Sequence, residues 1–88
     1  YLMSRLQTVL KEKGLTLRER ETAELVSKGL SNKEVANQLF ITEKSVKFHL
    51  TNLYKKLKVT SRAQLIVSCL PHMAFFEPEE DVGSETPA

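Results

Sequence analysis

Hydrophobic positions with helical spacing recur along the chain, and each run is bounded by residues that typically start or stop a helix. The first run places Leu2, Leu6, Val9 and Leu10 on one helical face, and Gly14 closes it. The later runs are similar in length and are separated by short connections. The pattern predicts a leading helix at about residues 2–13, followed by helices near 17–28, 32–39, 43–57 and 62–70. No β-strand pattern competes with these helices.

Three of the predicted helices begin with a hydroxyl residue that is followed three positions later by Glu or Gln. The pairs are Thr16 with Glu19, Ser31 with Glu34, and Ser61 with Gln64. Each pair predicts a capping box, in which the two side chains satisfy otherwise unpaired backbone amides. Thr42 starts the helix at 43–57 with a weaker box, because Ser45 stands at the third helical position. Gly29 and Pro71 are expected to end two of the helices.

The connection between the helices at 32–39 and 43–57 is the shortest, with only Phe40 and Ile41 before Thr42. Two helices joined this closely must cross sharply, which predicts a helix-turn-helix in an all-α fold. The single cysteine, Cys69, cannot form an internal disulfide, and no Cys/His cluster has zinc spacing. A small apolar core therefore has to hold the fold, and we expect no metal or cofactor.

Charge is distributed unevenly along the 88 residues, although 13 Lys and Arg against 11 Asp and Glu leave a net charge of only +2. Residues 77–88 hold five acidic residues and no basic one, so residues 1–76 carry a net +7. The acidic segment, with its Pro and Gly, is predicted to be a disordered tail. Residues 71–76 form an apolar extension that we expect to pack back on the domain.

The chain is expected to be a piece of a longer cytoplasmic protein. Its first residue is Tyr1, no secretory signal follows, and no apolar run has the roughly 20 residues that a membrane-spanning helix needs. The length argues for one domain in this piece. The leading helix, within residues 1–14, is either a docked fifth element or the end of an interdomain linker, and we favour the linker.

The predicted helix at 43–57 has two chemically different faces. On a helical wheel its apolar residues fall within about 60°, which is typical of a face buried in a core. The other side has a sector about 100° wide, with no acidic residue beyond Glu43 at the start of the helix. This basic sector consists of Lys44, Lys47, Phe48, Thr51, Lys55 and Lys58. A solvated surface is the simple alternative, but solvated faces usually alternate in sign, so the sector favours a polyanion such as DNA.

Four separated sequence runs resemble the LuxR/GerE-type helix-turn-helix domain, which also ends the NarL and FixJ response regulators. The runs are residues 15–21 (LTLRERE), 29–36 (GLSNKEVA), 41–50 (ITEKSVKFHL) and 56–62 (KLKVTSR). The resemblance covers about residues 15–70. It implies a four-helix domain whose helix at 43–57 enters the major groove of double-stranded DNA, in a bacterial regulator of transcription.

The resemblance also implies which residues contact DNA. The positions that match base contacts are Lys47, Phe48 and Thr51. The positions that match phosphate contacts are Asn32, Lys33, Thr42, Lys44, Ser45 and Lys55, and Lys58 adds a further cation near the backbone. Free amides at a helix start attract phosphate, which agrees with these positions.

This chain departs from the family pattern at several positions. Lys58 replaces the usual glycine that closes the helix in a left-handed conformation. Thr22 and Ala23 stand where larger apolar side chains are common, which predicts looser packing of their helix. Phe48 and Thr51 lie at positions that vary, so the operator sequence cannot be borrowed from relatives.

The predicted helix at 62–70 has a second apolar stripe about 100° from its core face. The stripe consists of Ala63, Val67 and Leu70 and is expected to contact a second copy of the chain, so that a dimer binds a pseudo-palindromic site. Alternatively, Val67 is covered by the segment that contains Phe75 and Phe76. Arg62 is expected to pair with Glu19 or Glu21.

Two other side chains invite a chemical role. His49 has no recognisable nucleophile and carboxylate around it, so we expect it to pack beside its helix or to contact one phosphate. Cys69 shares a helical face with Leu65 and is expected to be a core residue rather than a redox switch.

We therefore expect a non-enzymatic DNA-binding domain with an upstream regulatory domain, and with RNA polymerase as a candidate further partner. The rival interpretation is a helical protein-interaction module whose basic face binds an acidic protein. An enzyme is a distant third, because the sequence contains neither a metal cluster nor a glycine-rich phosphate loop.

Overall fold

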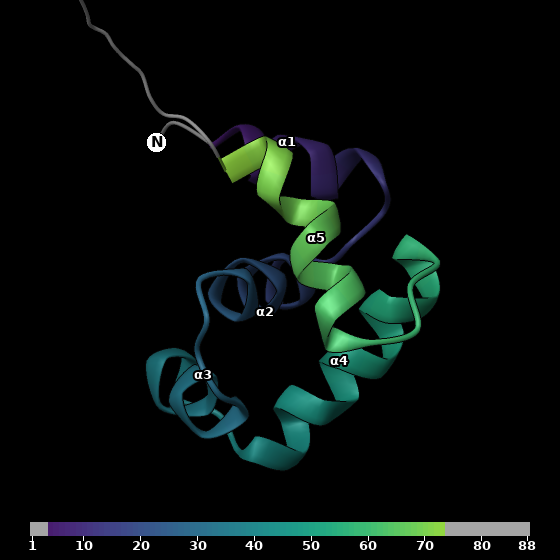
Figure 1. Cartoon of the computed structure of the whole chain (residues 1–88). Helices are drawn as coiled ribbons and strands as arrows, with labels where there is room; N and C mark the ends of the chain where they lie inside the picture. The colour runs from purple at the N-terminus through teal and green to yellow at the C-terminus, as the bar shows by residue number, and fades with distance from the viewer. Residues whose placement is uncertain (1–3, 74–88) are drawn as a thin grey trace, which may run out of the picture.

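The computed structural model describes residues 4–73, which form five α-helices (Figure 1). The helices are α1 (Arg5–Glu12), α2 (Leu17–Ser27), α3 (Asn32–Leu39), α4 (Glu43–Leu57) and α5 (Arg62–Met73). This part of the chain contains no strand, so the predicted all-α fold is confirmed. The predicted tail at 77–88 and the packing of Phe75 and Phe76 lie outside the described residues.

The predicted caps start the helices, with one difference. In α2 the Oε1 of Glu19 accepts from the Thr16 amide at 2.9 Å, and the Thr16 hydroxyl accepts from the Glu19 amide at 3.3 Å. The capping box of Ser31 with Glu34 is equally complete, and Thr42 alone caps α4.

The box predicted at Ser61 is only half right. The Ser61 hydroxyl accepts from the Gln64 amide N–H at 3.2 Å, as expected. The Oε1 of Gln64, however, accepts from Thr60 rather than from Ser61. Thr60 supplies two donors, its amide at 2.7 Å and its hydroxyl at 3.0 Å, which together outcompete the single amide of Ser61.

Four helices end in the same way, on a residue with a left-handed backbone. Gly14 and Gly29 have φ values of 87° and 96°, which confirms them as stop signals. Phe40 and Lys58 adopt φ values of 58° and 59° although each carries a side chain. After each of these residues, the next amide returns to a carbonyl five positions earlier, as from Val59 to Tyr54 at 3.0 Å. The left-handed end of α4 at Lys58 matches the expectation.

Pro71 does not end α5, contrary to the prediction. The helix continues through it to Met73, so residues 71–73 belong to α5 and not to a separate extension. Proline lacks the amide that would have bonded to the carbonyl of Val67, and its ring crowds that same carbonyl. Because Pro71 lies in the last turn, the helix loses a single hydrogen bond there.

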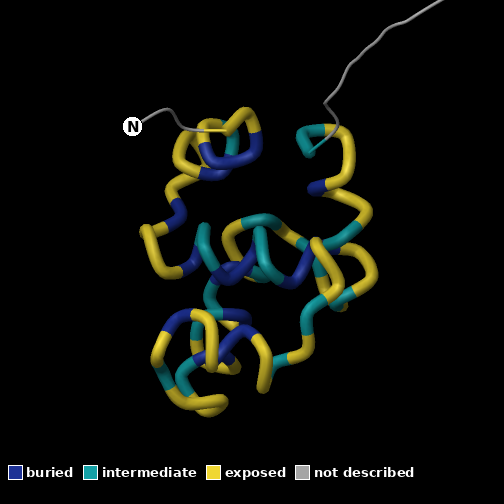
Figure 2. The backbone as a smooth tube through the Cα atoms, turned by 90° about the vertical axis from the view of Figure 1, so that its left-hand side faces the viewer, coloured by how far each residue is buried: buried dark blue, intermediate teal, exposed yellow. Residues whose placement is uncertain are grey.

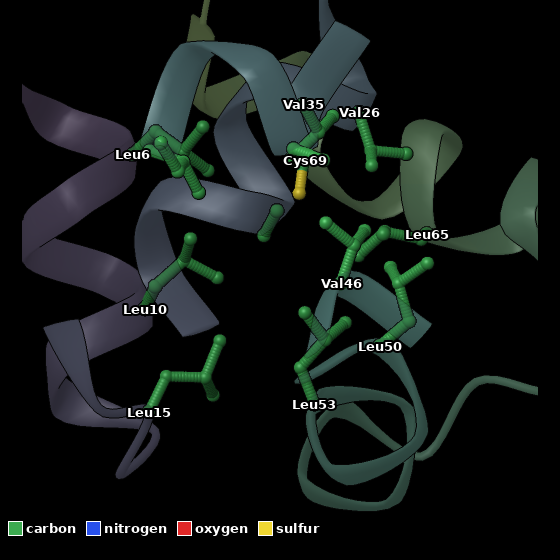
Figure 3. Packing of buried hydrophobic residues seen from close by; sticks show 13 residues of the cluster. Leu6, Leu10, Leu15, Val26, Val35, Val46, Leu50, Leu53, Leu65 and Cys69 are labelled. Atoms are coloured by element: carbon green, nitrogen blue, oxygen red, sulfur yellow. The ribbon is translucent and has the colours of Figure 1, made fainter. Parts of the chain in front are cut away.

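Helix α2 lies at the centre of the fold and contacts all four other helices. Buried positions turn inward along each helix, as Figure 2 shows. In Figure 3 the side chains of Leu6 and Leu10 from α1 point into the same interior as those of Val46, Leu50 and Leu53 from α4. The core consists of Leu6, Leu10, Leu15, Ala23, Val26, Val35, Ala36, Leu39, Val46, Leu50, Leu53, Leu65 and Cys69.

Helix α1 is docked on the domain rather than detached from it. Leu6 and Leu10 are almost fully buried, and a buried glutamine adds polar contacts. The Nε2 of Gln7 donates to Glu24 at 2.6 Å and to the carbonyl of Arg20 at 3.3 Å, while the Nε of Arg20 donates back to Gln7 at 3.2 Å. These bonds satisfy the buried amide and fix α1 against α2. Whether residues 1–14 also connect to another domain stays a prediction.

Candidate nucleic-acid interface

Helix α4 presents the basic sector to solvent because its opposite face is locked in the core. Val46, Leu50 and Leu53 are buried. On the other side Lys47, Phe48 and Thr51 are exposed, and the Phe48 side chain is 64% exposed. The two-faced helix predicted from the wheel is therefore confirmed. Phe48 therefore lies at the surface beside Lys47 and Thr51, where a partner can reach it.

The hydroxyl of Thr51 is already engaged within α4. Its Oγ1 lies 3.0 Å from the carbonyl oxygen of Lys47. Because a carbonyl only accepts, Thr51 donates its proton there. The outward groups of Thr51 are then its methyl group and the remaining lone pairs of its oxygen. They can contact a thymine methyl or accept from an amino group of adenine or cytosine.

The ring of His49 lies against that of Phe48, with centroids 5.8 Å apart and planes inclined by 64°. The histidine is half-buried, in keeping with the expected packing role. No group of three or more His, Cys, Asp or Glu side chains in residues 4–73 could hold a metal ion.

The starts of α3 and α4 each leave backbone amides free for an anion. The Ser31 hydroxyl accepts from the amide of Glu34 at 3.2 Å, and the Thr42 hydroxyl accepts from that of Ser45 at 3.0 Å. These caps use the third amide of each helix, so the first two have no intrahelical partner. Both helix starts therefore offer free backbone donors of the kind that suits an anion.

The side chains predicted to contact phosphate all lie at least partly at the surface. Asn32 and Ser45 are half-buried, and the others are exposed, namely Lys33, Thr42, Lys44, Lys55 and Lys58. They come from the starts of α3 and α4 and from the carboxyl-terminal part of α4.

Lys56 has a structural role that the sequence interpretation missed. Its Nζ lies 2.7 Å from the Oε1 of Glu19 and 3.2 Å from the carbonyl oxygen of Gly14. Glu19 is only 4% exposed. Burial raises the pKa of Glu19, but hydrogen bonds from Lys56 and Thr16 outweigh it, so the pKa lies below its ordinary value. The position of Lys56 outside the basic sector was the available signal.

Arg62 does not pair with Glu19 or Glu21 as expected. Its Nη1 donates to the Oδ1 of Asn32 at 2.7 Å, and its Nη2 donates to the carbonyl of Leu30. Both expected carboxylates have other partners, since Glu19 binds Lys56 and Glu21 binds Arg18. Arg62 therefore braces the start of α5 against the start of α3.

The predicted dimer stripe on α5 is exposed. Val67 and Leu70 are 65% and 51% exposed, and Ala63 is also at the surface. An open groove runs beside the stripe and is lined by Lys58, Val59, Ala63, Gln64, Val67 and Ser68. Cys69, on the core face of the same helix, is buried as predicted, and burial raises the pKa of its thiol despite an opposing hydrogen bond with Ser27.

Residues 13–69 match the model of the family described as bacterial regulatory proteins, luxR family. The chain belongs to this luxR family. The match begins after α1 and includes both helices of the helix-turn-helix, which confirms the resemblance found in the sequence. None of the helices between residues 4 and 73 has the length and apolarity needed to cross a bilayer.

Several luxR-family relatives resemble the chain. Spore germination protein GerE of Bacillus subtilis is 46% identical over 56 residues, which cover 64% of this chain and 76% of GerE. Transcriptional regulatory protein LiaR of the same species is 44% identical over 61 residues, covering 69% of this chain and 29% of LiaR. An HTH-type transcriptional regulator of Mycobacterium bovis is 50% identical over 52 residues, covering 59% of this chain and only 6% of that protein.

Proposed function

We propose that the chain is the DNA-binding output domain of a bacterial transcription regulator and that α4 reads a specific sequence in the major groove. The observation that carries this proposal is the basic sector of α4, which lies opposite a fully buried face of the same helix. A helix anchored in this way can insert its exposed side into the groove without losing core contacts.

Lys47, Phe48 and Thr51 are proposed to contact bases. The ammonium group of Lys47 suits the acceptors of guanine, and the ring of Phe48 suits a thymine methyl. Thr51 offers its methyl group and an accepting oxygen, because its hydroxyl proton is donated to the backbone carbonyl of Lys47. These side chains would give the domain its sequence preference.

Phosphate contacts are proposed to fix the register of the helix on the duplex. The free amides at the starts of α3 and α4 supply neutral donors, and nearby lysines supply charge. The side chains proposed for this role are Asn32, Lys33, Thr42, Lys44, Ser45, Lys55 and Lys58.

A second copy is proposed to cover the exposed stripe of α5. Because Ala63, Val67 and Leu70 are apolar, pairing of two identical stripes removes them from water. The stripe is small, so we expect the chain to be mostly monomeric in dilute solution and to pair on DNA. The two copies would then read half-sites about 10 base pairs apart.

The longer protein is proposed to contain an upstream regulatory domain and to act in the cytoplasm on promoter DNA, where RNA polymerase is a candidate partner. The chain spans 29% of LiaR, so LiaR contains much sequence outside the matched part. The domain itself is proposed to be non-enzymatic and to act by occupying DNA.

The rival function is a protein-interaction module that binds an acidic protein. Measuring the binding of duplex DNA distinguishes this rival from the proposed DNA-binding domain. We expect the chain to bind a duplex with a steep salt dependence. Lys33→Ala should weaken binding to all sequences alike and reduce the salt slope by about one unit. Lys11→Ala removes an exposed lysine from α1 and serves as the matched control with an unchanged slope. Absence of salt-dependent duplex binding would contradict the proposed function.

A further inference from the structure

The guanidinium of Arg62 joins two helix starts that are 30 residues apart in sequence. Arg62 is the first residue of α5, and Asn32 is the first residue of α3. One nitrogen of Arg62 donates to the side-chain oxygen of Asn32, and the other donates to the carbonyl of Leu30, just before α3. Arg62 is half-buried between these elements.

This contact decides which way the amide of Asn32 points. A guanidinium group is only a donor, so Asn32 must turn its oxygen toward Arg62. The Nδ2 group then points away from Arg62 and keeps two N–H donors. Within residues 4–73 the hydrogen bonds include no acceptor for this Nδ2, although Asn32 is half-buried.

The free Nδ2 belongs to a helix start that already offers donors to an anion. The amides of Asn32 and Lys33 are the first two of α3 and have no intrahelical partner. The positive charge of Arg62, next to the oxygen of the Asn32 amide, also polarises the amide and strengthens its Nδ2 donors. The arrangement therefore prepares a neutral side chain to donate to a phosphate.

We propose that Arg62 is a positioning residue for DNA binding, which acts by holding the Asn32 amide so that its Nδ2 donates to a DNA phosphate. Arg62 itself does not touch the DNA. The inference rests on the proposed function, because it requires that the start of α3 faces the phosphate backbone. It also links α5, which carries the dimer stripe, to a DNA contact on α3.

A double-mutant cycle on a mixed-sequence duplex tests the positioning role, because phosphate contacts do not depend on sequence. We expect Arg62→Gln and Asn32→Ala each to weaken binding by about five- to tenfold. The double variant should bind no more weakly than the single variants, because both remove the same phosphate contact. Additive losses would show that Arg62 acts independently of Asn32 and would overturn the proposal.

The salt slope separates positioning from a direct contact. Arg62→Gln should weaken binding without changing the slope, because no cation is lost from the DNA surface. A slope reduced by about one unit, as expected for Lys33→Ala, would mean that Arg62 contacts phosphate itself and would also overturn the proposal.

A conservative variant guards against an effect on folding. Arg62→Lys keeps a donor for Asn32 and should recover part of the affinity that Arg62→Gln loses, with circular dichroism confirming equal helicity. If Arg62→Gln does not fold, the cycle is run with Arg62→Met, which keeps the aliphatic stem but has no donor for Asn32, together with Asn32→Ala. Failure of the wild-type chain to bind any duplex would reject the proposed function as well, whereas normal wild-type binding with an additive cycle would reject only the positioning role.

Discussion

Helices α4 and α5 are built alike toward the core but differ in what they show to solvent. Val46, Leu50 and Leu53 bury one side of α4, and Leu65 and Cys69 bury one side of α5. The exposed side of α4 carries lysines, whereas the exposed stripe of α5 consists of Ala63, Val67 and Leu70.

This difference suits the two tasks that we propose for the domain, DNA binding and pairing with a second copy. Lysines are well solvated until they meet a polyanion, so the exposed side of α4 suits a partner that is charged and transient. An exposed apolar stripe is unfavourable in water and suits a surface of its own kind. The lysines of α4 would therefore set affinity and sequence choice, while the α5 stripe would set the spacing of two copies.

The largest effect is expected from a charge in the α5 stripe. Val67→Glu should abolish cooperative binding to a full site and lower the affinity for it by about a hundredfold, because a carboxylate cannot be buried between two copies without a partner. Binding to a half-site should stay near normal. Band shifts on both sites, together with circular dichroism, measure the two expectations.

The matched control for Val67→Glu adds the same charge elsewhere. Thr8 is exposed on α1, so Thr8→Glu should leave cooperative binding intact. An unfolded Val67→Glu variant would contradict the dimer stripe and would favour the alternative that Val67 is covered within its own chain by the segment containing Phe75 and Phe76.

The second prediction removes an exposed side chain of α4 and leaves the α5 stripe intact. Lys47→Ala should lower the affinity for the specific site by about 1 to 3 kcal/mol, because Lys47 is proposed to contact a base. Cooperativity between two copies should persist. Titrations of specific and mixed-sequence duplexes at fixed salt measure the loss of preference. Equal losses of affinity on both duplexes would mean that Lys47 contacts a phosphate rather than a base.

The features of the fold that depend on local sequence were predictable, and those that depend on helix crossing were not. The caps at Thr16 and Ser31 need only residues three positions apart, and the two faces of α4 need only its periodicity. The partner of Arg62 lies 30 residues away and depends on where α5 meets α3.

Two other structural details depended on the same kind of context. The bond between Lys56 and Glu19 was missed because it depends on where α4 crosses the start of α2, although the position of Lys56 outside the basic sector was a signal. Pro71 was misjudged because a proline in a last turn costs one hydrogen bond rather than the whole helix. The surface exposure of the proposed base contacts, by contrast, followed from the periodicity of α4.

The third prediction uses pH to loosen the end of α4. Since the pKa of Glu19 is lowered in the folded state, its contribution to stability is fully present above the unfolded pKa of about 4.3 and is lost as pH falls through the folded pKa. Glu19→Gln should lower the free energy of unfolding at neutral pH by about 1 kcal/mol and flatten its decline between neutral and acidic pH. Denaturant titrations across that range measure both effects.

Glu34→Gln is the control for the ion pair in this experiment. Glu34 also completes a capping box, because its Oε1 accepts from the Ser31 amide at 2.8 Å, but it is exposed and forms no salt bridge within residues 4–73. Glu34→Gln should therefore lower the free energy of unfolding less than Glu19→Gln does. Identical pH profiles for the two variants would show that Lys56 contributes nothing through Glu19.

The smallest effect is expected at Lys58, where α4 ends. Its left-handed backbone costs about 1 kcal/mol in a residue with a side chain, whereas glycine adopts that conformation freely. Lys58→Gly should raise the free energy of unfolding by about 0.5 kcal/mol, since the greater entropy of unfolded glycine offsets part of the relief. It should also reduce the salt slope of duplex binding by about one unit, because a cation is lost.

Lys58→Ala removes the same charge but keeps the strain, so it should match Lys58→Gly in DNA binding and be less stable. A Lys58→Gly variant that is less stable than Lys58→Ala would show that the left-handed end of α4 carries no strain large enough to outweigh the entropy of unfolded glycine. An unchanged salt slope in both variants would contradict a phosphate contact of Lys58.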